Sequence, residues 1–448
     1  MEHSPRREGG GRDGESGEAE TAAAAEGADG RALWSWCFYD WANSGFPTVV
    51  VTYVFSAYFA KVIAADEVTG TSLWAYAMSL SGLAIAVASP ILGAIADQSG
   101  RRKPWVGAFT MLCVAGSAAL WWVVPGMERV AFALAVAATA NFAFEMAIVY
   151  YNAMLPGLVP ANRLGRLSGW GWGLGYLGGL TCLGLSLLLV MPKPPLLGMD
   201  AATYEPVRAT AVLVAGWYAV FALPLFLYVP DTPATGVPPI RAIRRGLSAL
   251  WATIKQVRRF RQVAIYLLAH MIYADGLNTL FALGGLYLAV TFGMDFDEIL
   301  LFGICMNLAA AAGAFAFGWV DDWIGPKRTI LIALGSMFVI GLGLVLAETR
   351  TMLWALAIPL GLFFGPAQAA SRSLMARLAP RHLVAEFFGL YALSGKATAF
   401  VGPALFGMVT SMTGSQRWGM STILLFIAAG ALLLLAVKEP GRSISKAS

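Results

Sequence analysis

Two segments of this 448-residue sequence, separated by 225 positions, decide how the chain is organised. Residues 93–103 read GAIADQSGRRK, and residues 318–328 read GWVDDWIGPKR. Both segments follow the pattern G-x-x-x-D-x-x-G and continue into basic residues. A pattern that recurs at such a distance predicts that the chain consists of two related halves.

Two further echoes occur in the same order along the chain. Asp40 and Asn43 recur as Asp275 and Asn278, and the stretch 152–169 resembles 372–389. Each echo is weak alone, but three in one order indicate a duplication. If each half contains six membrane spans, the halves run in the same direction, because six is an even number.

The composition identifies lipid as the solvent around these halves. Apolar residues make up 58% of the chain and charged residues only 13%, and the mean hydropathy is +0.67. A helix needs about 20 apolar residues to cross the hydrocarbon core. Twelve stretches meet this length, two of them broken by one acid each, Glu145 and Asp275. No strand-like alternation appears, so we predict an all-α membrane protein with twelve transmembrane helices and not a barrel.

The basic residues predict the orientation. If the N-terminus is cytoplasmic, 24 of the 31 Lys and Arg residues fall on the cytoplasmic side. This bias predicts a multi-pass membrane protein with both termini in the cytoplasm. It also explains the net charge of +5 as an orientation signal and not as a nucleic-acid site. The Arg241–Arg261 cluster is expected to be a cytoplasmic loop next to anionic lipid.

These observations divide the chain into five parts. The first thirty residues carry eight acids, which is typical of a disordered tail. The predicted parts are an acidic tail (1–33), an N-terminal half (34–230), a basic linker (231–261), a C-terminal half (262–438) and a C-terminal tail (439–448).

The duplicated glycine and aspartate pattern resembles the motif between helices 2 and 3 of major facilitator transporters. That resemblance, together with the parallel repeat, implies the major facilitator fold in two parallel six-helix halves. An aspartate at this place can cap a neighbouring helix or meet a basic residue and so latch a cytoplasmic gate. The expected gate residues are Gly93, Asp97, Gly100, Arg101, Arg102, Gly318, Asp322, Gly325, Lys327, Arg328, Asn152 and Arg372.

Longer motifs narrow the resemblance to one family. Residues 36–44 read WCFYDWANS, residues 151–156 read YNAMLP, and residues 165–179 read GRLSGWGWGLGYLGG. Residues 368–373 read QAASRS, and residues 385–396 contain AEFFGLY followed by Gly-Lys. From about residue 34 to 440, the chain resembles the autophagy-linked vacuolar amino-acid effluxers, including their bacterial "unknown major facilitator" branch. The resemblance implies export of neutral or aromatic amino acids, and bacterial members extend to other solutes.

Ionisable residues inside the spans are the main candidates for chemistry. Each costs about 2.5–3.5 kcal/mol at the centre of a membrane helix, so function is the default interpretation. Four such residues stand out: Asp40, Glu145, Asp275 and Lys396. Asp275 is a candidate for proton coupling or for binding a substrate amine, and Glu145 for binding substrate or a proton. Lys396 is a candidate for binding a substrate carboxylate, and Asp40 for binding substrate or a proton or for a gate. A structural alternative for Glu145 is an ion pair with Lys396.

Three acidic residues and one basic residue inside the spans match the opposite charges of a zwitterionic substrate. Its amine would lie near Asp275 or Glu145, and its carboxylate near Lys396. Polar neighbours expected to line the pocket are Asn43, Asn278, Asn307, Tyr150 and Gln368.

The sequence contains little that suggests an enzyme, a metal or a cofactor. The four cysteines lie in spans without paired spacing, and the three histidines are scattered. No phosphate-binding G-x-x-x-x-G-K-[ST] loop is present. We therefore expect a monomeric secondary transporter of a small solute, with membrane lipid and protons as partners and without nucleic acid. The alternatives are a lipid or lysolipid flippase on the same fold, a transporter of another metabolite, and a receptor-like or structural membrane protein.

Overall fold

The computed structural model describes residues 29–192, 194, 198–256 and 258–439. Within these ranges, twelve helical segments are long and apolar enough to cross a membrane. The described residues form helices and connecting turns without a β-strand. The predicted class, an all-α membrane protein with twelve spans, is therefore confirmed.

The N-terminal half contains six spans. The first combines α2 (Gly30–Asn43) with η1 (Phe46–Tyr53), α3 (Phe55–Tyr58) and η2 (Phe59–Ile63). The others are α4 (Glu67–Ser99), α5 (Lys103–Ala119) with η3 (Leu120–Trp122), η4 (Met127–Arg129) with α6 (Val130–Met154) and η5 (Leu155–Gly157), η6 (Ala161–Arg163) with α7 (Leu164–Val190), and α8 (Glu205–Tyr228).

The linker and the C-terminal half follow the same plan. Helix α9 (Pro239–Lys255) lies between the halves in sequence. The last six spans are α10 (Arg261–Phe292), α11 (Phe296–Ile324), α12 (Pro326–Leu346), α13 (Arg350–Leu378), η8 (Arg381–Leu383) with α14 (Val384–Lys396) and α15 (Val401–Thr413), and α16 (Gln416–Leu435).

Acidic and hydroxyl caps set several helix starts. The Asp66 carboxylate accepts hydrogen bonds from the N–H groups of Val68 and Thr69 at the start of α4. Asp295 and Glu298 form a reciprocal capping box at the start of α11. Such caps satisfy backbone donors that the helix itself leaves free.

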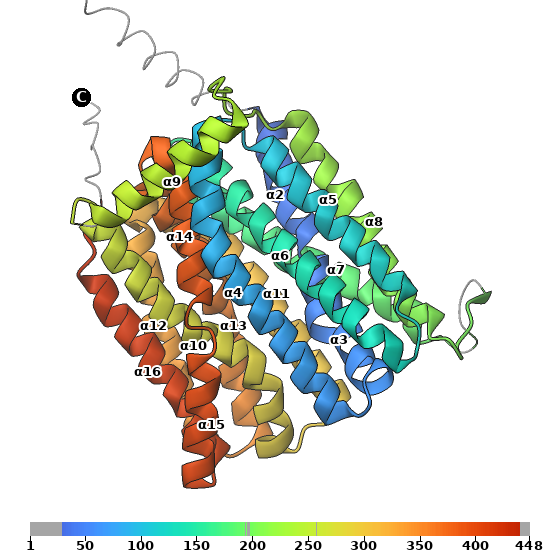
Figure 1. Cartoon of the computed structure of the whole chain (residues 1–448). Helices are drawn as coiled ribbons and strands as arrows, with labels where there is room; N and C mark the ends of the chain where they lie inside the picture. Colours follow the sequence, from blue (N-terminus) through green and yellow to red (C-terminus); the bar gives the residue numbers. More distant parts are fainter. Residues whose placement is uncertain (1–28, 193, 195–197, 257, 440–448) are drawn as a thin grey trace, which may run out of the picture.

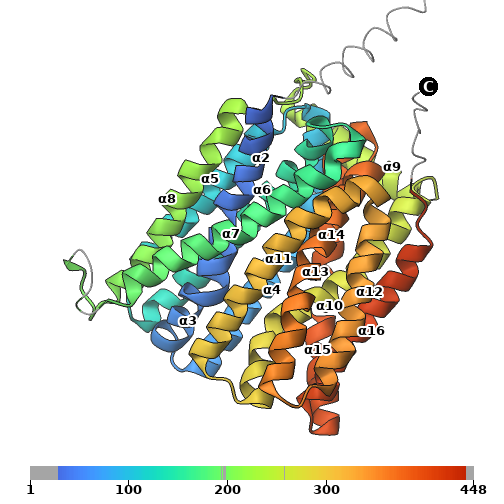
Figure 2. The same cartoon turned by 180° about the vertical axis from the view of Figure 1, so that it is seen from behind.

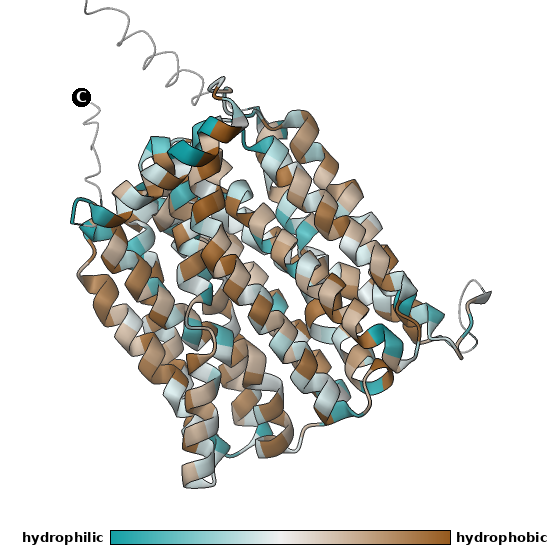
Figure 3. Ribbon diagram, in the orientation of Figure 1, coloured by the Kyte–Doolittle hydropathy of each residue, from teal (hydrophilic) through white to brown (hydrophobic). Residues whose placement is uncertain are grey.

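The two halves stand side by side, as Figures 1 and 2 show. The start of α2 and the end of α16 lie at the end of the bundle that carries α9, which we call the α9 end. Apolar residues cover most of the helix lengths, whereas hydrophilic residues gather on α9 and around the ends (Figure 3). Between the halves, α4 packs on α14 and α7 packs on α11.

Two spans depart from regular α-helix. In the first span, η1 is a π-helix that begins at Phe46 and has a proline, Pro47, as its second residue. The eleventh span is interrupted between α14 and α15, where residues 397–400 form turns. Pro403 has no N–H to donate to the carbonyl of Ala399, so the helix is weakened there. Hydrophobicity alone predicts neither feature.

The helices can be compared with the predicted tails and linker where the structure describes them. Most of the predicted acidic tail (1–28), and residues 440–448 of the C-terminal tail, fall outside the described residues. Residues 30–33 belong to α2, because the Asp29 carboxylate caps this helix by accepting from the N–H of Arg31. The predicted linker loop contains a helix, α9, over Pro239–Lys255.

Candidate functional site

At the α9 end, one buried arginine of the C-terminal half donates hydrogen bonds to residues of three helices of the N-terminal half. Arg372 on α13 is only 3% exposed. Its guanidinium donates to Asp40 Oδ2 on α2 at 2.9 Å and to Asn152 Oδ1 on α6 at 3.2 Å. It also donates to Ser168 on α7, to the hydroxyl at 2.9 Å and to the carbonyl at 2.7 Å. The guanidinium lies 4.9 Å from the centre of the Trp36 ring, so its charge is paired, hydrogen-bonded and stacked.

The two repeated aspartates each cap a helix of the opposite half. Asp97 of α4 accepts from the N–H groups of Ala385 and Glu386 at the start of α14, at 3.0 and 2.8 Å. Asp322 of α11 accepts from the N–H of Gly165, at the start of α7, at 2.8 Å. A carboxylate at a helix N-terminus is favoured by the free N–H groups and by the helix dipole. Both contacts join the halves at the α9 end.

The basic residues of the same motif bind mainly within their own half. Arg102 donates to the carbonyl of Ala153 at 2.6 Å and lies 3.9 Å from Asp97. Burial lowers the pKa of Arg102 from its ordinary value, and the neighbouring aspartates oppose this shift. Arg101 lies 3.6 Å from Asp231 on the surface.

The second copy of the motif is built in the same way. Lys327 donates through Nζ to the carbonyls of Leu435 and Val437 at 2.7 and 2.6 Å. Arg328 is exposed.

The motif glycines serve turns and close helix contacts. Gly100 and Gly325 end α4 and α11 with φ angles of +79° and +97°, a region that favours glycine. Gly93 lies against the backbone of Ala385, and Gly318 against that of Arg166. Both of these contacts join α-helices of opposite halves.

Besides Arg372–Asp40 and Arg166–Asp322, whose charged atoms lie 2.9 and 2.8 Å apart, a third ion pair crosses between the halves. Glu145 of α6 and Lys396 at the end of α14 are 2.6 Å apart. Their side chains are 18% and 34% exposed, so this pair is only partly buried. The geometry matches the ion pair between Glu145 and Lys396 that the sequence offered as a structural alternative.

Asp275 is more deeply buried than Glu145 and Lys396 and lies beside the interruption of the eleventh span. It is 2% exposed, and its Oδ1 accepts from the N–H of Gly402, in the first turn of α15, at 3.3 Å. Among the described residues, its Oδ2 has no hydrogen-bond partner. Asn278, one turn further along α10, is exposed and donates to the carbonyl of Gly395 at 3.4 Å. Asp40 and Asp275, although related by the repeat, thus have different surroundings.

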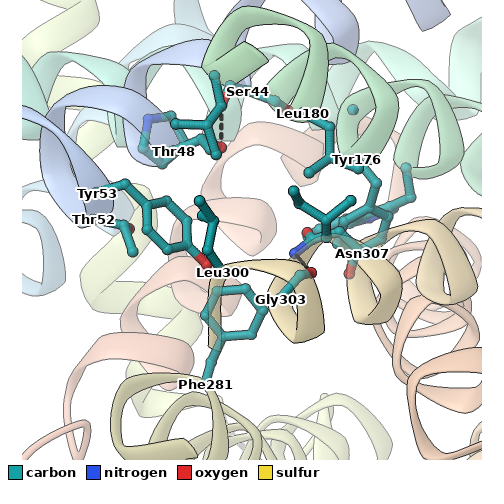
Figure 4. A pocket seen from close by; sticks show the side chains of 15 residues that line it. Ser44, Thr48, Thr52, Tyr53, Tyr176, Leu180, Phe281, Leu300, Gly303 and Asn307 are labelled. Atoms are coloured by element: carbon teal, nitrogen blue, oxygen red, sulfur yellow. Dashed lines mark hydrogen bonds between the residues drawn. The ribbon is translucent and has the colours of Figure 1, made fainter. Parts of the chain in front are cut away.

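A cavity of about 180 Å³ lies between the two halves. Its polar lining comes from Ser44, Thr48, Thr52 and Tyr53 of the first span, Tyr176 of α7 and Asn307 of α11. Figure 4 shows these side chains around the cavity, with Phe281 of α10 below them. Thr48 Oγ1 donates to the Ser44 carbonyl and Asn307 Nδ2 to the Gly303 carbonyl, each at 2.8 Å. Much of the π-helix η1 faces this cavity, and π-helical turns are frequent at functional sites.

A second, mostly apolar cavity of about 310 Å³ adjoins the first. The two share Thr52, Tyr53, Tyr176, Phe281, Gly303 and Asn307. From there the second cavity extends into the C-terminal half, among α10, α11, α12, α13 and α16. Leucine, isoleucine, methionine and phenylalanine side chains form much of its wall.

Of the substrate candidates derived from the sequence, Asn307 lines both cavities. The linings of the two cavities do not include Asp40, Glu145, Asp275, Asn278 or Lys396. The others lie elsewhere: Asn43 is buried, and its Nδ2 has no acceptor among the described residues. Tyr150 packs against Trp105, and Gln368 is half-buried in α13. The hydroxyl residues Ser44, Thr48, Tyr53 and Tyr176 were not expected here, although Ser44 closes the WCFYDWANS motif.

Comparison with known proteins agrees with this architecture. The model of the family described as "Vacuole effluxer Atg22 like" matches residues 56–165 and 160–445. The uncharacterized MFS-type transporter YxiO of Bacillus subtilis is 27% identical over 414 residues, covering 90% of this chain and 94% of YxiO. Autophagy-related protein 22-2 of Emericella nidulans is 28% identical over 300 residues. That alignment covers 60% of this chain and about half (49%) of the fungal protein.

A solved structure supports the same fold. The proton:xylose symporter XylE superposes with a TM-score of 0.71 at 15% sequence identity, covering 91% of this chain and 96% of XylE. The predicted major facilitator fold is confirmed, and such proteins are transporters and not enzymes. Because the family model matches most of the sequence, this chain belongs to the Atg22-like family of major facilitator transporters.

Proposed function

We propose that this transporter is a secondary active exporter of amino acids that works by alternating access and couples transport to protons. The observation that carries the proposal is the asymmetry between the two ends of the bundle. Arg372, Asp97 and Asp322 join the halves at the α9 end. The cavity instead lies towards the opposite end, because its α11 lining falls in the first three turns after Phe296.

A rocking motion of the two halves about this cavity would open the α9 end and close the opposite end. The α9-end contacts all cross between halves, so each must break for the other access state to form. The cavity draws its walls from both halves and would remain at the centre of the motion, as in other transporters built from repeats.

We base the proposed substrate class on the Glu145–Lys396 pair, which joins the two halves but is not among the residues that line either cavity. An amino acid carries one ammonium and one carboxylate group, the same two charges that this pair presents. The substrate carboxylate would replace Glu145 on Lys396, and the substrate ammonium would meet Glu145. Because this exchange conserves charge pairing, it limits the desolvation cost of placing charges between the halves.

Asp275 is the proposed proton site. Its carboxyl group is buried, one oxygen has no hydrogen-bond partner among the described residues, and a single backbone N–H contacts the other. A buried carboxylate with so few donors gains from binding a proton. Since α15 supplies that N–H, protonation of Asp275 would act on the eleventh span next to its interruption between α14 and α15.

The proposed orientation places the α9 end in the cytoplasm. It rests on the 24 of 31 Lys and Arg residues that fall on that side. The conformation described is then closed to the cytoplasm. A monomer in a bacterial inner membrane is the simplest arrangement for this fold.

The apolar cavity supports a second candidate, a lipid or lysolipid flippase. Its volume of about 310 Å³ and its aliphatic lining would accept a hydrocarbon chain as well as an apolar amino-acid side chain. An acyl chain would need this cavity, whereas a small polar amino acid would not. The two functions therefore differ in the substrates that they predict.

Purified protein in proteoliposomes distinguishes these functions. Labelled amino acids and fluorescent lysolipids would be tested in the same vesicles, with and without an imposed proton gradient. We expect saturable amino-acid flux that the gradient accelerates. Lysolipid translocation without amino-acid flux would establish the alternative, and absence of all flux would point to a receptor-like protein.

A further inference from the structure

We propose that α9 is a membrane-surface helix that binds anionic lipid headgroups and ties the closed α9 end to the bilayer. This inference concerns a surface outside the cavity and does not depend on which solute is transported. Helix α9 belongs to the linker, and neither the cavity nor the contacts between halves require its outer face.

One face of α9 is already occupied by the transporter. Ala242 and Leu250 are buried, and Gly246 lies against the backbone of Ile95 in α4. Ile95 is four residues before the end of α4 at Ser99. The helix therefore packs beside the last turns of a transmembrane span, at the depth where the headgroups of the bilayer begin. In Figure 1, α9 crosses in front of this part of the bundle.

A second face of α9 is apolar and exposed. Ile240 is 80% exposed and Trp251 is 59% exposed. Ile243, Leu247 and Ile254 are exposed as well, and together the five positions follow the three- and four-residue spacing of one helical stripe. In water this stripe would be unfavourable, whereas at a membrane surface it would lie among the acyl-chain ends, with the tryptophan at headgroup level.

Positive charge borders the apolar stripe. Arg241, Arg244 and Arg245 are exposed on the first half of α9, and Lys255 lies 5.2 Å from the Trp251 ring at its end. No acidic residue occurs between Pro239 and Lys255. An amphipathic helix with an apolar stripe and adjacent cations fits an anionic lipid surface, and this charge complementarity identifies the occupant.

The position of α9 gives this binding a consequence for transport. Helix α9 packs on α4 of the N-terminal half, while Phe260, the N-cap residue of α10, contacts Phe387 of α14 at 5.2 Å between ring centres. The linker thus joins α9 on α4 to the start of α10, which packs near the point where Asp97 caps α14. Anionic lipid that holds α9 against the bundle would stabilise the state with a closed α9 end.

Lipid binding to the full-length purified protein tests the headgroup preference. Native mass spectrometry would compare bound phosphatidylglycerol with bound phosphatidylcholine, for the wild type and for an Arg241→Gln/Arg244→Gln/Arg245→Gln variant. Each basic side chain near an anionic surface contributes about a fivefold preference. We expect a marked phosphatidylglycerol preference that falls at least fivefold in the variant. An unchanged preference would overturn the proposal.

A matched control removes three cations elsewhere at the α9 end. Arg163, Arg381 and Lys438 are exposed and lie outside α9, so their replacement by glutamine should leave the lipid preference intact. An equal loss in this control would show that general charge, and not α9, attracts the lipid.

Cysteine labelling tests insertion of the apolar stripe. Leu247→Cys and Arg245→Cys, each in a Cys305→Ser background, would react with a membrane-impermeant maleimide in detergent and in phosphatidylglycerol vesicles. We expect the vesicles to protect position 247 and not position 245. Equal reactivity at both positions in vesicles would place the stripe in water or against a soluble partner and would refute the proposal.

Discussion

Replacing Asp40 with asparagine should open the α9 end of the transporter. The substitution keeps the size of the side chain and removes the charge that faces Arg372 at 2.9 Å. Arg372 is 3% exposed, so it cannot regain water without movement of the halves. In the proposed opposite access state the contact would be absent, so the substitution would cost little there.

The size of the effect follows from the remaining contacts. Breaking a buried ion pair by removing one partner costs about 3–5 kcal/mol. Arg372 keeps its hydrogen bonds to Ser168 and Asn152, so the lower end of that range applies. A cost of about 3 kcal/mol shifts the ratio of the two states about 150-fold. A preference of about 99:1 for the closed α9 end would become a nearly equal mixture.

Distances between spin labels would measure this shift. Labels at Arg163 and His382 report on the α9 end, one in each half, and labels at Val68 and Met412 report on the opposite end; all four positions are exposed. In the Asp40→Asn variant, the first distance should lengthen and the second should shorten. Glu298→Gln is the control, because Glu298 pairs with Arg350 within the C-terminal half. Unchanged distances in Asp40→Asn would refute the gate role of the Arg372 contact.

Three further predictions test other parts of the account. Asp275→Asn should insert normally but lose the acceleration of transport by a proton gradient, and flux that keeps its full pH dependence would exclude Asp275 as the proton site. Glu145→Gln should raise the KM for amino acids about tenfold or more, because a charge-assisted hydrogen bond contributes about 1.5–3 kcal/mol; an unchanged KM in the flux assay would remove the pair from the substrate site. Gly389→Val should open the α9 end without loss of folded protein, since its Cβ would meet the Ser89 carbonyl of α4, and label distances equal to those of the wild type would contradict this.

The fold was largely predictable because membrane spans are encoded by simple properties. About 20 apolar residues in sequence suffice to identify a span, and the scarcity of charge separates one span from the next. The duplicated motif around Asp97 and Asp322 indicated the repeat, and the structure gives these two aspartates equivalent hydrogen bonds on opposite halves. The π-helix at Phe46–Tyr53 and the break after Lys396 were not predictable, because backbone hydrogen-bond register has no hydropathy signal.

The cavity was less predictable than the charged contacts. An ionisable side chain inside a membrane span costs free energy and is therefore rare there, so Asp40, Glu145 and Asp275 could be recognised from the sequence as candidates. Serine, threonine and tyrosine hydroxyl groups cost little free energy inside a span. They can form a hydrogen bond to the helix backbone, as the Thr48 hydroxyl does by donating to the carbonyl of Ser44. Which of them face a cavity depends on helix rotation and on contacts between distant segments, and hydropathy does not report either.

Counterflow in proteoliposomes is the most direct test of amino-acid transport by alternating access. Vesicles loaded with an unlabelled amino acid would be diluted into a trace of the same labelled compound, in the absence of a proton gradient. A carrier whose two halves close alternately around one cavity predicts a transient accumulation of label above its external concentration. Entry of label only to equilibrium, or no entry for any amino acid of the panel, would contradict the account.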